Sequence, residues 1–267
     1  MNMVQTSAGT LIREWRQRRR MSQLSLALEA EISQRHLSFV ESGRSAPSRE
    51  MVIRLADQLS VPLRQRNRML VAAGFAPIYG ERALDDPALK PALKAVELVL
   101  KGHEPYPAIA IDKGWNMVLA NAAVAPLLDG VEEPALLSSP VNVLRLSLHP
   151  KGLATRIANL DEWRTHLIER LRMQIDATAD LALVALEREL SAYPGRPSAS
   201  SRPYDAAANI AVPLRLRIDG ELLSFISTTT VFGTPLDATL SELAIESFFP
   251  ADAETGEALR RLIKKPR

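Results

Sequence analysis

The sequence predicts two domains of different class, an all-α N-terminal domain of five helices and an α+β C-terminal domain. In the first 75 residues, apolar side chains recur at helical spacing behind Ser residues that are typical N-caps. Proline and glycine then concentrate between residues 75 and 91. Beyond that break, apolar runs flank two tight-turn signals, Asp112-Lys113-Gly114 and Asp219-Gly220, as expected for β-hairpins.

Local start and stop signals define the N-terminal helices. Ser22 and Ser33 are expected to cap the second and third helices, Pro62 to open the fifth and Gly74 to end it. Counted from cap to stop, the five helices are predicted at about residues 10–20, 22–30, 33–43, 49–59 and 62–74. We place the boundary of this domain at residues 1–76.

The second and third helices are short and are separated by a tight turn, which is the plan of a DNA-binding helix-turn-helix. In that motif one helix braces the unit on the sugar-phosphate backbone, and the next offers its N-terminal side chains to base edges in the major groove. The charge distribution agrees with this interpretation. Residues 1–80 contain 12 Arg, no Lys and 6 acidic residues, a net charge of +6, whereas residues 81–267 contain 21 basic and 25 acidic residues, a net charge of −4. Arg favours bidentate contacts with phosphate and guanine.

The C-terminal elements follow a linker and connecting helix, which we place at residues 77–104, and fill residues 105–267. The predicted order is a hairpin over 107–120, a helix over 121–128, helices over 141–192, a loop over 194–203, a hairpin over 212–232, a strand or helix over 239–249 and a helix over 253–264. Leu160, Trp163, Leu167, Leu171 and Ile175 form one apolar stripe on the central helix.

Several functional classes are not expected. The chain has no Cys, so disulfides, thiolate metal sites and Cys nucleophiles are excluded. It has no apolar run of about 18 residues, as a membrane span would need. Its N-terminus also lacks the basic segment followed by an apolar segment that is typical of a signal peptide, so we expect a cytoplasmic protein. Nucleophile-elbow, Walker A, dinucleotide-binding and zinc-protease motifs are absent, so we expect neither an enzyme nor a cofactor or metal.

The segments MSQLSLA, ISQRHL and VESGR make the N-terminal domain similar to the Xre/Cro-type helix-turn-helix. This resemblance implies that Gln23 binds a phosphate, that Gln34 and Arg35 reach base edges, and that Phe39 faces the groove. Arg44 would meet the DNA backbone, and Ser38 is either a groove residue or a solvated one. The implied DNA-binding set is Gln23, Ser33, Gln34, Arg35, Ser38, Phe39 and Arg44.

The same resemblance implies an ion pair between Arg16 and Glu41 that holds the fold and does not touch DNA. One position departs from the pattern. Glu31 stands in the turn between the second and third helices, where Gly often adopts a positive φ. The turn therefore either differs or carries strain of roughly 1 kcal/mol.

The whole chain resembles the MmyB-like transcription regulators. The resemblance rests on RHLSFVESGR, AAGFAPIYGE, WNMVLANAAVAPLL, NVLRLSLHP and GTPLDATLSELAIESFFPAD. It implies a PAS-like C-terminal domain with a cavity for a hydrophobic small molecule such as a fatty-acyl compound. The few large aromatic residues of this half favour an aliphatic cavity, and we expect the helix over 121–128, including Ala122 and Ala123, to line it.

Polar groups near the apolar stripes are candidates for ligand contact, with surface or capping roles as the alternative for each. They are Asn121, Arg145, His149, Asn159 and Arg172, with Arg145 or Arg172 as the expected partner of a carboxylate. His149 could also be a haem ligand or a catalytic base, but His36, His103 and His166 show no ligand spacing around it. We favour the interpretation that His149 binds the last carbonyls of a helix that ends before Pro150.

Together these features predict a one-component transcription regulator. Its N-terminal domain binds an operator as a homodimer, and its C-terminal domain senses a small apolar effector. The alternative is a repressor whose C-terminal domain only mediates dimerisation, without a ligand.

Overall fold

The computed structural model describes residues 6–194, 212–232 and 237–264, and the predicted loop over 194–203 lies almost wholly outside them. The chain divides into two compact units. The first comprises residues 1–84 together with 234–241, and the second comprises residues 85–233 and 242–267. Each unit has its own apolar core. In the described residues, no helix is long and apolar enough to cross a membrane.

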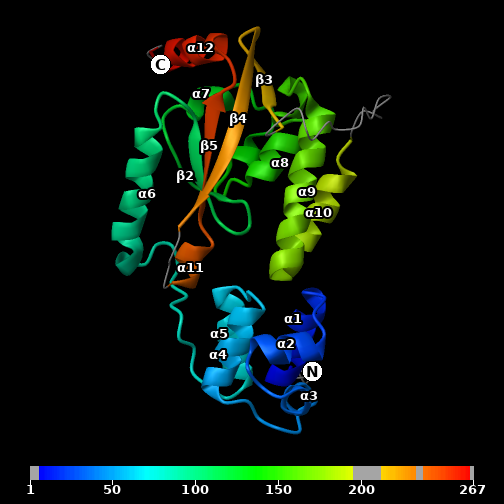
Figure 1. Cartoon of the computed structure of the whole chain (residues 1–267). Helices are drawn as coiled ribbons and strands as arrows, with labels where there is room; N and C mark the ends of the chain where they lie inside the picture. Colours follow the sequence, from blue (N-terminus) through cyan, green and yellow to red (C-terminus); the bar gives the residue numbers. More distant parts are fainter. Residues whose placement is uncertain (1–5, 195–211, 233–236, 265–267) are drawn as a thin grey trace. The chain divides into compact units, whose positions relative to one another are not determined.

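The first unit contains the five predicted helices (Figure 1). They are α1 (Ala8–Arg18), α2 (Gln23–Glu29), α3 (Gln34–Glu41), α4 (Arg49–Gln58) and α5 (Leu63–Ala72). Ser22 and Ser33 cap α2 and α3 as predicted, since their hydroxyl oxygens accept from the backbone N–H of Ser25 and His36. Helix α1 begins two residues before the predicted start, because Ser7 is its N-cap.

The core of this unit is formed by all five helices around side chains such as Ile12, Leu37 and Leu55, which are inaccessible to solvent. Gly9 allows α1 to approach α3 closely. A Cβ at this position would lie 2.0 Å from the carbonyl oxygen of Val40, so a side chain cannot be accommodated without moving α3.

The residues after α5 are fastened to the first unit rather than forming a free linker. The buried Asn67 accepts hydrogen bonds from the backbone N–H of Ile78 and Tyr79, and its amide nitrogen donates to the carbonyl of Tyr79 and the carboxylate of Glu81. This compact unit consequently extends to residue 84.

A short segment from late in the sequence also belongs to the first unit. We call residues 237–241, which include α11 (Ala238–Ser241), the strap. Asp237 forms a parallel bridge with Gly80 and accepts a hydrogen bond from Arg82 at 3.1 Å. Ala238 is fully buried, and its N–H donates to the carbonyl of Gly80 at 2.7 Å. The strap packs on α5. It lies within residues 105–267, which the sequence predicts to form the second domain.

The second unit is an antiparallel sheet with helices on both faces, which confirms the predicted α+β class. The strand order is β2-β1-β5-β4-β3. The strands are β1 (Ala108–Ile111), β2 (Met117–Ala120), β3 (Leu214–Ile218), β4 (Glu221–Val231) and β5 (Ala244–Pro250). Both predicted hairpins are present, and the turn between β3 and β4 contains Asp219 and Gly220 at positive φ, as in a tight hairpin turn.

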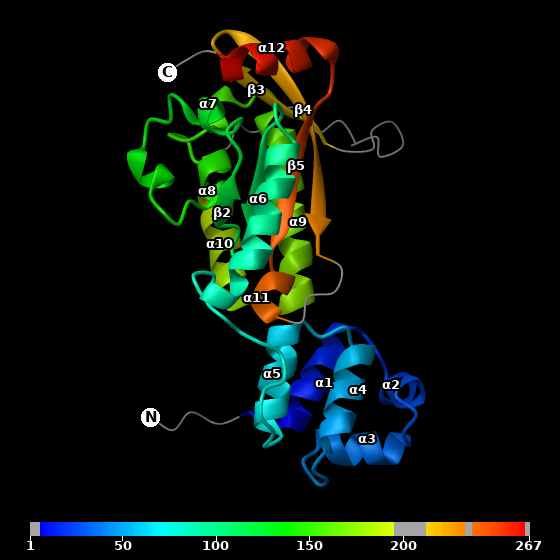
Figure 2. The same cartoon turned by 90° about the vertical axis from the view of Figure 1, so that its left-hand side faces the viewer.

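The helices of this unit cover the sheet unequally. One face is covered by α6 (Lys90–Gly102), which passes in front of the strands in Figure 2. The opposite face is covered by α8 (Val143–Leu148), α9 (Leu160–Thr178) and α10 (Leu181–Ala192), as Figure 1 shows. The remaining helical elements are α7 (Ala125–Leu128), η1 (Pro87–Leu89), η2 (Pro134–Leu137), η3 (Ala154–Arg156) and α12 (Ala253–Lys264), which packs on β4 and β5.

Two predicted helical stretches are shorter than expected. The helix over 121–128 is only the four-residue α7. The stretch over 141–192 is interrupted by Pro150 and Gly152 and again at Ala179, which adopts a φ of +57° at the end of α9. Asp180 then caps α10 through the N–H of Ala182. Residues 239–249, predicted as a strand or a helix, contain the end of α11 and most of β5.

Candidate functional site

The N-terminal end of α3 presents the side chains that were predicted to read DNA. Gln34 and Arg35 are exposed on its first turn, and Ser38 and Phe39 are partly exposed one turn later. Leu37 and Val40, on the other side of α3, are buried in the core. The packing of α3 therefore leaves these four side chains on its outward face, where the second helix of such a motif contacts DNA.

Phe39 brings two of the predicted cations together. The guanidinium of Arg35 lies 5.4 Å from the Phe39 ring centroid, and that of Arg44 lies 5.8 Å from it. Such cation–π contacts orient a guanidinium without neutralising its charge. Within the described residues, neither Arg35 nor Arg44 has an acidic partner, so both remain available to an external anion.

Beneath this face lies the predicted ion pair between Arg16 and Glu41. Arg16 Nε donates to Glu41 Oε1 at 2.6 Å, and Arg16 Nη2 donates to Oε2 at 2.8 Å. The Glu41 side chain is only 2% exposed. Gln23 also donates to Glu41 Oε2, at 2.8 Å, so one of the two amide protons of this predicted phosphate ligand is used inside the protein.

The hydrogen bonds around Glu41 determine its charge state. Burial raises the pKa of the Glu41 carboxyl, but the hydrogen bonds from Arg16 and Gln23 outweigh this effect, and the pKa lies below its ordinary value of 4.5. Arg16 Nη1 also donates to the carbonyl of Met21 at 2.9 Å, next to the start of α2. The pair thus joins α1, α3 and the entry to α2, which is a structural role.

The sequence predicts either an altered turn or a strained turn at Glu31, between α2 and α3. Glu31 has a φ of +53°, in the left-handed region that disfavours side chains other than Gly. Of the two alternatives, the strained turn is therefore the one observed.

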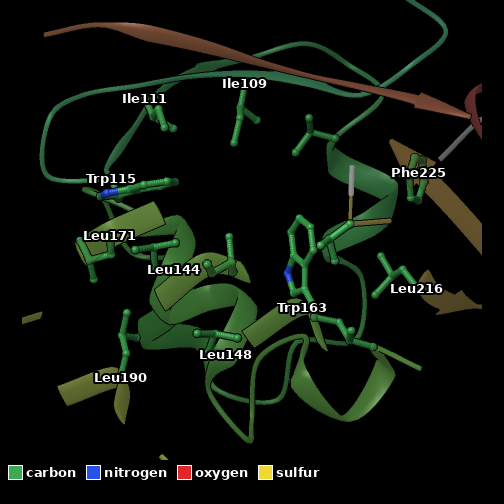
Figure 3. Close-up of a cluster of buried hydrophobic side chains, with 14 of the residues drawn as sticks. Ile109, Ile111, Trp115, Leu144, Leu148, Trp163, Leu171, Leu190, Leu216 and Phe225 are labelled. Carbon is green, nitrogen blue, oxygen red and sulfur yellow. The ribbon is translucent and has the colours of Figure 1, made fainter. Parts of the chain in front are cut away.

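The second site is an apolar cavity of about 110 Å³ in the second unit, between the sheet and the helices α7, α8 and α9. Figure 3 shows Ile109 and Ile111 of β1 pointing toward Trp163 of α9 and Leu144 of α8. The lining residues are Pro107, Ile109, Ile111, Trp115, Met117, Val124, Leu127, Leu128, Val143, Leu144, Leu146, Ser147, Leu153, Trp163, Leu167, Arg170, Leu214, Leu216, Phe225, Glu246 and Phe248. All but three of these residues are apolar.

One wall of the cavity is formed by a very short helix. Leu127 and Leu128 line it from α7, a helix of only four residues. Arg156 donates to the carbonyls of Leu127 and Asp129 and so fixes the end of α7. Burial lowers the pKa of Arg156, and its Nε is buried without a hydrogen-bond partner among the described residues.

Two charged residues, Arg170 and Glu246, line the cavity at one corner. Together with the exposed Thr229, which binds Arg170 but does not itself line the cavity, we call them the polar corner. Arg170 of α9 donates from Nη1 to Glu246 Oε1 at 2.7 Å and from Nη2 to Oε2 at 3.0 Å. Its Nη2 also donates to the Thr229 hydroxyl at 2.9 Å. The guanidinium lies 5.0 Å from the Trp115 ring centroid, and Trp115 itself has a φ of +64°.

None of the five predicted ligand-contacting residues lines this cavity. Asn121 is buried and donates to the carbonyls of Leu100 and Tyr106. Asn159 donates to the carbonyl of Pro213 and accepts from the N–H of Arg215. The other polar candidates are likewise bound to protein groups. Arg145 pairs with Glu189 at 2.7 Å, and Arg172 pairs with Glu187 at 2.7 Å.

His149 stands at the end of α8, as expected, but its side chain does not bind the last carbonyls of that helix. Its Nδ1 accepts from the N–H of Lys151 at 3.1 Å, and its ring contacts Tyr193 edge-on at 5.2 Å. No group of three or more His, Cys, Asp or Glu side chains in the described residues could hold a metal ion.

The sequence nevertheless contained a signal for the polar corner. Arg170 follows Trp163 by seven residues and Leu167 by three, so it falls on the apolar face of α9. Glu246 interrupts the apolar strand AIESFFP. A charged side chain on a face that must be buried requires a partner, and two such residues in one domain indicate a pair. Ala122 and Ala123, expected in the wall, do not line the cavity; Val124, Leu127 and Leu128 from the same segment do.

Comparison with known families matches one family model to each domain. A family described as "MmyB-like transcription regulator ligand binding domain" matches residues 93–262, and one described as "Helix-turn-helix" matches residues 12–65. No curated protein matches the chain. The first match covers more than half of the 267 residues. With a DNA-binding helix-turn-helix joined to this ligand-binding domain, the chain belongs to the MmyB-like transcription regulators.

Proposed function

We propose that the protein is a one-component regulator that binds an operator in the cytoplasm through α3. Gln34 and Arg35 read base edges, Ser38 and Phe39 contact the groove, and Ser33, Arg44 and the second amide proton of Gln23 contact the backbone. The observation that carries this proposal is the exposed pair of guanidinium groups that contact Phe39 on the outward face of α3, the helix that enters the groove in such motifs.

Binding-site selection with Arg35→Ala tests this docking. We expect the variant to lose about 1–3 kcal/mol on the selected site and to relax preference at one or two base pairs. Arg68→Ala is the matched control, because it removes the same charge from an exposed position on α5. Unchanged affinity and an unchanged selected site for Arg35→Ala would contradict the proposal.

The cavity of the second unit supports a sensor of an apolar effector. A domain that serves dimerisation alone needs only a filled core. The core of this unit instead contains a cavity that is lined mainly by apolar side chains. The five-stranded antiparallel sheet in the order β2-β1-β5-β4-β3 supports the PAS-like assignment. We expect a fatty-acyl compound, because the lining is aliphatic along most of its length.

The size of the cavity supports a wall that moves when the effector enters. An apolar cavity of about 150 Å³ admits one benzene molecule, and pockets for larger ligands have roughly 300–1,000 Å³. A cavity of about 110 Å³ therefore holds only part of an acyl chain. The short α7 is the wall that we expect to move, and its displacement would give the effector different affinities for two conformations, as regulation requires.

Filling the cavity tests the sensor. We expect fatty acids and their methyl esters of increasing chain length to be able to raise the melting temperature, with an optimum length in at least one of the two series, and Ile109→Phe to abolish the shift. Ile226→Phe is the matched control, because Ile226 on β4 is 40% exposed and does not line the cavity. A flat response of the wild-type protein to both series would favour a pure dimerisation domain.

We further propose that the working unit is a homodimer on a pseudo-palindrome. A single helix-turn-helix contacts too few base pairs to select one site in a genome, and dimers of such domains bind half-sites about one helical turn apart. Footprinting with analytical ultracentrifugation on DNA is the test. Protection of one half-site by a monomer would contradict the proposal.

A further inference from the structure

The polar corner offers hydrogen bonds to a ligand but no net charge. Glu246 and Thr229 are direct neighbours on the paired strands β5 and β4, and Arg170 reaches both from α9. The Thr229 hydroxyl also donates to Glu246 Oε2 at 3.3 Å. The Glu246 side chain is 5% exposed and that of Arg170 is 20% exposed. The guanidinium is thus fully paired with one carboxylate inside the protein.

An ionised carboxylate on the effector would disturb this pair. If it replaced Glu246, a buried carboxylate would lose its partner, which is among the most costly changes in a protein interior. If it joined the pair, two negative charges would share one guanidinium in a poorly solvated place. Both arrangements disfavour a fatty acid in its ionised form, which is the form that predominates in water at neutral pH.

An uncharged oxygen acceptor meets neither penalty. The hydrogen bonds of Arg170 within the described residues use one Nη1 proton and both Nη2 protons, so the Nε proton and the second Nη1 proton are left over. The Trp115 ring under the guanidinium keeps its plane fixed. A hydroxyl, ester or amide oxygen can accept from the guanidinium while Glu246 stays in place.

We infer that the polar corner selects an effector with an uncharged hydrogen-bonding head, such as an acyl ester, an acyl amide or a long-chain alcohol, over the free acid. The inference rests on the proposed function, in which the cavity admits an apolar chain. It makes Arg170 and Glu246 the residues that determine specificity for the head.

Ligands of equal chain length and different head test the inference on the full chain. We would measure binding of decan-1-ol, methyl decanoate, decanoate and decane at pH 7.4, and repeat the series with sixteen carbons. The alcohol and the ester should bind at least about tenfold tighter than the carboxylate and the alkane. In Glu246→Gln the unpaired guanidinium should reverse the order, so that the carboxylate binds best. Glu221→Gln is the matched control, since Glu221 pairs with Arg261 at an exposed position.

The outcomes separate the inference from the proposed function. Binding that depends on chain length but not on the head, or tightest binding of the carboxylate to wild-type protein, overturns the inference and leaves the apolar sensor standing. No binding in either series overturns both. If Glu246→Gln does not fold, the order of ligand affinities for the wild-type protein still tests the inference.

Discussion

Single residues in the helix-turn-helix carry opposite contributions to stability. Glu31 is held at a φ of +53°, which is unfavourable for any residue with a side chain. Glu41 accepts three hydrogen bonds from Arg16 and Gln23 in a buried place. The first residue stores strain in the turn, and the second secures the helices on either side of it.

Replacing Glu31 by Gly should relieve this strain. We expect Glu31→Gly to raise the free energy of unfolding of the first unit by up to about 1 kcal/mol, because Gly adopts positive φ readily but loses more entropy on folding. Amide hydrogen exchange of α1–α5 in the full chain would measure it. Glu31→Ala is the control, since it removes the same charge without the conformational freedom. An equal gain in both variants would point to charge rather than strain.

Replacing Glu41 by Ala should destabilise the same unit by up to roughly 3 kcal/mol, because it strands a buried guanidinium. The pH dependence follows from the lowered pKa. A carboxyl with a lower pKa in the folded state stabilises above the unfolded value of 4.5, and this stabilisation is lost as the pH falls through the folded pKa. Wild type should therefore lose more stability than Glu41→Ala below about pH 4.5. Urea unfolding across this range checks it, with the exposed Glu14→Ala as control, and parallel pH profiles of wild type and Glu41→Ala would contradict it.

Among the secondary-structure elements, the strap is held to the first unit by side-chain and backbone hydrogen bonds that can be tested by mutation. Asp237 Oδ1 accepts from the N–H of Thr239 at 2.9 Å, and its Oδ2 accepts from Arg82. The Thr239 hydroxyl donates to the carbonyl of Arg82 at 2.7 Å. Gly80 permits this approach, because a Cβ there would lie 2.4 Å from Asp237 Oδ2.

Asp237→Ala should release the strap. We expect faster amide exchange over residues 238–241, since both the cap of α11 and the ion pair with Arg82 are lost. Asp252→Ala serves as control, because it removes a similar cap from α12 in the other unit, where the Asp252 carboxylate accepts from the N–H of Thr255. Unchanged exchange in the strap would show that backbone contacts alone hold it.

The elements also show what the sequence could and could not predict. Ser caps and the Asp219-Gly220 turn depend on only a few neighbouring residues. The sequence alone therefore predicts α2, α3 and the hairpin of β3 and β4. The break after α9 occurs at Ala179, where Gly would have been the usual signal. The contact between Arg82 and Asp237 joins residues 155 positions apart and has no local signature. The ligand-contacting candidates failed to reach the cavity because each polar group found a protein partner that spacing could not reveal.

For the whole molecule, we expect the concentration of positive charge in the N-terminal part to govern DNA affinity. We expect affinity to fall steeply with salt, as condensed counterions are released from the DNA. Arg44→Ala should lower the slope of log K against log salt by about 1 without changing the selected site. Arg68→Ala, on α5, should leave the slope unchanged. Equal slopes for wild type and Arg44→Ala would remove Arg44 from the DNA contacts.

The strap has a consequence for how this protein can be divided and how it could evolve. The polypeptide passes between the two compact units three times, at residues 84/85, 233/234 and 241/242. The DNA-binding unit is therefore discontinuous in sequence. The ligand-binding unit cannot be replaced as one continuous segment through a single junction. A truncated protein that stops at residue 84, or a chimera that imports another sensor after residue 84, lacks Asp237 and Ala238 and leaves Gly80 and Arg82 without their partners. Exchange of sensors between relatives should succeed only when the strap is transplanted back along with the recipient's helix-turn-helix.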